Sequence, residues 1–202
     1  MMRRLLAGSA FLVALTTGCA TVGEKPAVVV PPPAGRTLVV AVGLDAQNRS
    51  TVQALARDLA AELDDRWGSV FEANAFAKQA ARYGVPVAVD HLEQVAAGTP
   101  LDPALVEHLK QTHRIQTVVF LDVRLFDQDW GQETKRTRIK LVAWALDLTR
   151  LAVLWRATSA PEVEGETGRS FQIASEIAIR ELVRAIVGEP AATGPPTVSD
   201  GR

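Results

Sequence analysis

Asp127 begins a polar segment in which acidic side chains could bind calcium. A second aspartate and a glutamate follow at alternate positions around Gly131, and carboxylate oxygens are the ligands that calcium prefers. A calcium loop of the EF-hand type needs glycine at its sixth position and a carboxylate at its twelfth. Counted from Asp127, these positions hold Gln132 and Arg138. The spacing excludes that calcium site and instead predicts a solvated polar loop over residues 127–134.

The three histidines do not form a predicted metal site either. His108 and His113 are five residues apart, which turns their directions about 140° from each other on an ideal helix. His91 has no second ligand at metal-like spacing. The sequence contains no nucleophile-elbow serine and no glycine-rich phosphate loop. We therefore predict no catalytic residue, no metal and no cofactor, and we expect that the protein is not an enzyme.

Composition places the chain among ordinary globular proteins. Of its 202 residues, 48% are hydrophobic, and the formal net charge is −1. A nucleic-acid-binding domain usually carries a strong basic excess, so we expect no nucleic-acid partner. The length suits one domain with extensions at its ends.

Cys19 is the only cysteine, and its position suggests a chemical role. It follows a basic start and an apolar stretch, residues 5–16, that is too short to span a bilayer and is typical of a secretory signal. The residues before it resemble the bacterial lipobox, in which small residues precede a cysteine that receives diacylglycerol. Gly18 and Cys19 match that motif, whereas Thr16 stands where it usually has leucine. The resemblance implies lipidation of Cys19; the alternative is a plain signal peptide in which Cys19 is incidental.

The sequence divides into four predicted segments, the first of which ends just before Cys19. We predict a lipoprotein signal peptide at 1–18, a proline-rich tether at 19–36, a single domain at 37–188 and a disordered tail at 189–202. Ala20 rather than aspartate follows the cysteine, and in families with that sorting rule this implies the outer membrane. The lipobox resemblance therefore implies a protein attached by palmitate-type acyl chains to the periplasmic face of the outer membrane.

Hydrophobic periodicity predicts the elements of the domain. Val52, Leu55, Leu59 and Leu63 recur at helical spacing, whereas residues 135–160 alternate as two strands joined by a turn. Strands are expected at 37–44, 85–89 and 115–126, and helices at 51–67, 71–83, 90–97, 102–113 and from 167 or 170 to 188. We expect no pair of long strands with lipid-facing alternation. This order predicts an α/β (α+β) fold, with a mixed sheet of three to five strands packed by helices.

Two features of the predicted hairpin suggest contact with a partner. Arg136 and Arg138 belong to a basic strand start, and Trp130 lies in the polar loop before it. If that loop is symmetric about residue 130, Asp122 lies opposite Arg138. A tip of this kind could touch a partner protein or an anionic envelope polymer, with Trp130, Arg136 and Arg138 as contact residues; the alternative is a solvated hairpin tip.

The turn of the hairpin carries a resemblance to a family. Asp147, Thr149, Val153, Leu154 and Trp155 match a pattern in periplasmic lipoproteins related to the curli-secretion and penicillin-binding-protein-activator lipoproteins. Here an arginine stands where the family has glycine, so the turn is different or slightly longer. The resemblance implies a small α/β periplasmic domain similar to the anticodon-binding fold, with no enzymatic activity.

The same resemblance implies two functions, and a third remains as an alternative that does not come from the resemblance. The first is a lipid-anchored module that binds an envelope protein in envelope assembly or in polysaccharide or protein secretion, with homo-oligomers in some relatives. The second is an activator of a peptidoglycan synthase. The third, an enzyme or a small-ligand-binding domain, would gain support if Asp90, His91 and Glu93 gathered in a deep pocket.

Overall fold

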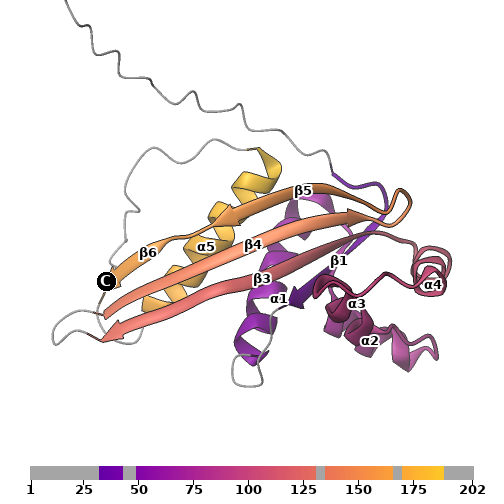
Figure 1. The fold of residues 1–202 in the computed structure, drawn as a ribbon, viewed down its shortest axis with the longest axis horizontal. Coiled ribbons are helices and arrows are strands. Elements are labelled where there is room, and N and C mark those ends of the chain that lie inside the picture. Colours follow the sequence, from indigo (N-terminus) through magenta and orange to yellow (C-terminus); the bar gives the residue numbers. More distant parts are fainter. Residues whose placement is uncertain (1–31, 43–48, 131–134, 166–169, 189–202) are drawn as a thin grey trace, which may run out of the picture.

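The computed structural model describes residues 32–42, 49–130, 135–165 and 170–188. The predicted signal peptide, Cys19, most of the tether and the predicted disordered tail lie outside these residues. Figure 1 shows one sheet with helices on its two faces. The described elements, in chain order, are β1 Arg36–Val42, α1 Arg49–Trp67, β2 Val70–Glu72, α2 Ala73–Arg82, α3 Val89–Ala96, α4 Pro103–His113, β3 Ile115–Trp130, β4 Lys135–Asp147, β5 Ala152–Ser159, β6 Glu162–Gly165 and α5 Ser170–Val187.

The sheet is mixed, as the sequence predicts. Its strand order is β2-β1-β3-β4-β5, and β6 pairs with the far end of β4. β1 is parallel to both β2 and β3, whereas β3, β4 and β5 are antiparallel. The first strand returns through helices and the later strands are joined closely, which is why the two halves differ in direction. The α/β fold with a mixed sheet is confirmed, and the described residues form six strands where three to five were expected.

Both faces of β1 are buried, as its unbroken apolar sequence predicts. Val39 and Ala41 face the core under α1 and α5, and Leu38 and Val40 face the core under α2, α3 and α4. The two helical layers therefore pack on opposite faces of one sheet, with β1 and β3 at its centre. The predicted amphipathic helix at 51–67 is confirmed as α1, and its buried stripe lies on the first of these cores.

The long hairpin formed by β3 and β4 corrects two expectations. β3 has 16 residues and β4 has 13, so residues 127–130 belong to a strand and not to a loop. The register places Asp127, not Asp122, opposite Arg138. Asp122 faces Val142 and binds the neighbouring Arg124 at 2.7 Å. Polar residues continue the ladder here because backbone hydrogen bonds form whatever the side chains are.

The segment after α2 is also different from its prediction. Residues 85–89 form no strand; the chain runs without regular structure to α3, which begins at Val89. Pro86 has no N–H for a ladder, and its carbonyl accepts a hydrogen bond from Nε2 of His108 at 3.2 Å. Further along, Asp102 caps α4 as expected: its carboxylate accepts from the N–H of Ala104 at 2.9 Å.

The turn between β4 and β5 is held by an aspartate. The carboxylate of Asp147 accepts from the N–H groups of Thr149 and Arg150 at 2.7 and 3.1 Å. Leu151 closes the turn with a left-handed φ of 51°, a conformation that normally favours glycine. The turn thus occupies residues 148–151. The resembled family has glycine at the position of Arg150, whereas the left-handed residue of this turn is the next one, Leu151.

Candidate interaction surfaces

The basic strand start of the hairpin is paired within the domain. Glu162 of β6 binds both arginines, with Nε of Arg136 and Nε of Arg138 each 3.0 Å from one of its carboxylate oxygens. Since the two arginines are two residues apart, they share one face of β4. All three side chains are about half exposed, so the ion pairs contribute little to stability. The structure therefore brings Arg136 and Arg138 together on the surface, but with a carboxylate between them.

Trp130, the third predicted contact residue, ends β3 opposite Lys135. Its side chain lies outside the residues whose exposure is described, so its part in a contact stays a prediction. The other two tryptophans of the sheet are partly buried, and each packs against one of the two cores. The ring of Trp144 stacks on Phe120 at 5.4 Å, and Trp155 meets Trp67 edge-on at 6.3 Å.

The outer edge of β5 carries three of the four large hydrophobic side chains that are exposed among the described residues. β5 ends the strand order, so its outer N–H and C=O groups have no neighbouring strand within the described sheet. Leu151, which ends the turn, is 60% exposed, and Val153 and Leu154 at the start of β5 are 61% and 42% exposed. β6 follows β5 along the same side of β4 and pairs with the far end of that strand, so it continues the edge of the sheet (Figure 1).

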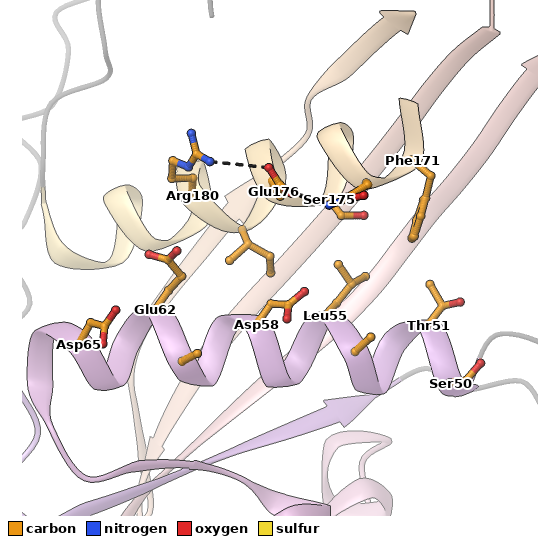
Figure 2. Close-up of a pocket in the computed structure, with 14 residues that line it drawn as sticks. Ser50, Thr51, Leu55, Asp58, Glu62, Asp65, Phe171, Ser175, Glu176 and Arg180 are labelled. Atoms are coloured by element: carbon orange, nitrogen blue, oxygen red, sulfur yellow. Dashed lines mark hydrogen bonds and ion pairs between the residues drawn. The ribbon is translucent and has the colours of Figure 1, made fainter. Parts of the chain in front are cut away.

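A groove between α1 and α5 was not expected from the sequence (Figure 2). It has a volume of about 650 Å³ and is open to solvent. Asp58, Glu62 and Asp65 line it from α1, and Ser175 and Glu176 line it from α5. A signal for it was present in the sequence: the three α1 carboxylates follow one another at helical spacing beside the buried leucine stripe. What the sequence alone does not show is that α5 faces them.

The predicted separation of His108 and His113 is wrong. Their ring centroids lie 5.0 Å apart, and the ring of His113 also meets Phe76 at 5.4 Å. Nδ1 of His108 accepts from the hydroxyl of Thr112 at 3.3 Å, since its Nε2 donates to a carbonyl. Long side chains lean along the helix axis, so directions drawn from Cα positions underestimate such contacts.

His113 is buried, and its Nε2 has no hydrogen-bond partner among the described residues. Burial lowers the pKa of His113 below its ordinary value, and the nearby His108 and Arg36 lower it further. The charged form is disfavoured because burial removes it from solvent and because the positive charges of its neighbours repel it. The pair is therefore structural, packing α4 against α2.

Replacing His113 with phenylalanine should make the domain less sensitive to acid. The unfolded chain binds a proton at His113 before the folded one does, so the free energy of unfolding should fall as pH drops below the unfolded pKa of about 6.5. Urea unfolding of wild-type and H113F protein between pH 8 and pH 5 measures this. The difference between the two proteins should be constant near pH 8 and should change towards pH 5. Parallel curves throughout would contradict the assignment.

The side chains of Asp90, His91 and Glu93 lie on α3 and line neither described pocket. Burial raises the pKa of Glu93, an effect that Arg49 partly offsets and Asp90 reinforces. Among the described residues, no group of three or more His, Cys, Asp or Glu side chains is placed to hold a metal ion. No helix in the described ranges is both long and apolar enough to cross a membrane.

Comparison with known proteins supports the fold and leaves the family open. No protein-family model and no curated protein sequence matches this chain. Among solved structures, it is similar to the PelC dodecamer from Paraburkholderia phytofirmans, with a TM-score of 0.51, 11% identity and coverage of 82% of this chain and 96% of that chain. The fold defined above is thus one that PelC shares.

Two other solved structures, of a lipoprotein and of the LpoB C-terminal domain, are less similar to this chain. Lipoprotein GNA1162 from Neisseria meningitidis has a TM-score of 0.47 and 16% identity, over 73% of this chain and 97% of that chain. The LpoB C-terminal domain from Salmonella enterica has a TM-score of 0.32 and 12% identity, over 63% of this chain and 82% of that chain.

Proposed function

We propose that this chain is a lipid-anchored protein of the bacterial envelope whose α/β domain binds other proteins in envelope assembly or secretion. The observation that carries the proposal is the open edge of β5. A strand edge with unpaired backbone groups and exposed apolar side chains is a ready template for another chain, and monomeric proteins usually protect such edges with charges or covering segments. Here Leu151, Val153 and Leu154 lie exposed instead.

The backbone of Leu151 adds to this argument. A leucine with a φ of 51° is strained, because its Cβ crowds the following carbonyl. It is also 60% exposed, so the side chain gains little from burial in this domain. A partner that covers it would bury this apolar side chain, which is the favourable term that the domain alone does not provide.

A second copy of this chain is the first partner to test. The PelC structure with which the fold is shared is a dodecamer, and an edge strand can pair with a copy of itself as readily as with another protein. The proline-rich tether and the predicted lipid on Cys19 would concentrate copies on one membrane surface and so favour such contacts.

Replacing Val153 with lysine should weaken association through the β5 edge. Lysine on an edge strand repels a second copy and blocks a dry contact, and we expect at least about a tenfold weaker self-association. Sedimentation velocity over a range of protein concentrations measures this. Tyr83 is the matched control: it is 77% exposed and lies at the end of α2, away from β5, so Tyr83→Lys should leave association unchanged.

The outcome that contradicts the proposal is equally specific. If wild-type protein stays monomeric at all concentrations, and its cross-links to envelope proteins in cells are the same as those of the Val153→Lys variant, the β5 edge is not a docking surface.

A further inference from the structure

The α1/α5 groove combines charge, an apolar floor and an unsatisfied polar group. It lies on the face of the sheet covered by α1 and α5, and Figure 2 shows the α1 side chains rising towards α5. The β5 edge proposed above is a different surface, so the two proposals can fail separately.

The rim of the groove is acidic. Asp58, Glu62 and Asp65 follow each other at steps of four and three residues, which places them on one side of α1 over about 10 Å. Glu176 adds a fourth carboxylate from α5, and Arg180, 3.9 Å from Glu176, is the one cation among the lining residues. Four carboxylates against one guanidinium leave a formal charge of −3, which favours a cationic ligand.

Ser175 provides an observation independent of that charge. It lines the groove, its residue is only 7% exposed, and its Oγ has no hydrogen-bond partner among the described residues. A buried hydroxyl without a partner is costly, and a ligand group in the groove would satisfy it. Since a hydroxyl oxygen accepts hydrogen bonds, an arginine or lysine side chain fits it.

The floor of the groove is apolar. Leu55 and Ile179 are buried beneath it, and Phe171 stands half-buried at one end. An apolar floor between charged rims suits a ligand with an apolar stripe flanked by cations. The groove is elongated along two helices and open to solvent, which fits a chain segment better than an enclosed small molecule.

We propose that the α1/α5 groove binds a basic amphipathic helix of a partner protein. Its apolar side chains lie on Leu55 and Ile179, as in other helix-in-groove complexes. Its lysine or arginine side chains pair with Asp58, Glu62 and Asp65, whose repeat matches that of cations along one side of a helix. The acidic rim repels nucleic acids and anionic membrane surfaces, which leaves a basic protein segment as the occupant.

The test uses a labelled 18-residue helical peptide of leucine and lysine and the detergent-solubilised full-length protein. Fluorescence anisotropy should detect binding that weakens as salt rises. The Asp58→Asn, Glu62→Gln and Asp65→Asn triple variant should bind about tenfold more weakly and with a flatter salt dependence, since it loses three surface ion pairs. Ser175→Ala should weaken binding by a smaller factor. Circular dichroism confirms that each variant is folded.

Three controls decide the result. Glu107→Gln removes an exposed carboxylate from α4, on the opposite face of the sheet, and should leave binding unchanged. A scrambled peptide of the same composition, without an apolar stripe, should bind at least about tenfold more weakly, because it cannot place leucines on the floor. A triple variant that binds as tightly as the wild type, or a scrambled peptide that binds equally well, would overturn the proposal.

Discussion

Phe120→Ala should reduce the free energy of unfolding by about 3–5 kcal/mol. Phe120 lies in the middle of β3, is 1% exposed, and stacks on Trp144 with an angle of 26° between the rings. Its removal leaves a cavity in the core beneath α2, α3 and α4. The neighbouring strands on both sides are held by the sheet, so the surrounding residues cannot move in to fill this cavity. Since single domains are stable by only about 5–15 kcal/mol, this is a large share of the total.

Urea unfolding followed by tryptophan fluorescence measures this effect, and Trp144 reports directly on the altered site. Tyr83→Ala is the control: the side chain is 77% exposed, so its loss should change stability by no more than about 0.5 kcal/mol. A loss below about 1 kcal/mol for Phe120→Ala, with an unchanged m-value, would mean that the core beneath α2, α3 and α4 is not packed as described.

The parts of the fold that the sequence predicts are those with a long and regular hydrophobic pattern. α1 shows four leucine or valine positions at helical spacing, and residues 38–42 of β1 are an unbroken apolar run. These patterns depend on burial alone, which a single sequence records directly. The cap at Asp102, followed by proline, is local chemistry of the same kind.

The elements missed by sequence analysis are short or depend on a distant partner. β2 has three residues and β6 has four, too few for alternation to show. Residues 127–130 look like a loop because they are polar, and only their pairing with β4 makes them a strand. Symmetry about residue 130 places Asp122 opposite Arg138, but the ladder pairs Trp130 with Lys135, so its centre lies further along the chain and Asp127 takes that place. The bulge in β3 changes this register by only one residue.

The candidate surfaces divide in the same way. Arg136 and Arg138 could be named from their composition, but Glu162, which pairs with both, comes from a strand that the sequence did not reveal. The acidic residues of α1 follow one another at helical spacing in the sequence. That they line a groove depends on α5, more than a hundred residues later in the chain. Surfaces built from two distant elements require the topology first.

Lipidation at Cys19 is the feature on which the proposed location depends. We expect Cys19→Ser to abolish incorporation of a palmitate analogue, because the acyl chains are attached through the thiol. Each buried CH₂ contributes about 0.8 kcal/mol to membrane binding, so loss of several chains removes the anchor. The protein should then move from the membrane fraction to the soluble periplasmic fraction, which immunoblotting of fractionated cells measures.

A second variant separates the lipid from the signal sequence. In Cys19→Ser the apolar stretch at 5–16 could remain attached if processing also requires the cysteine, and it would then hold the chain at the membrane without any lipid. Replacing residues 1–19 by a cleavable signal peptide without a lipobox removes both, and this protein should be fully soluble. If Cys19→Ser keeps the label and its membrane fractionation, Cys19 is incidental. A different result is that neither variant carries the label and only the signal-replaced protein is released from the membrane. In that case the uncleaved apolar stretch holds the Cys19→Ser chain at the membrane, and the lipid is still the anchor of the wild-type protein.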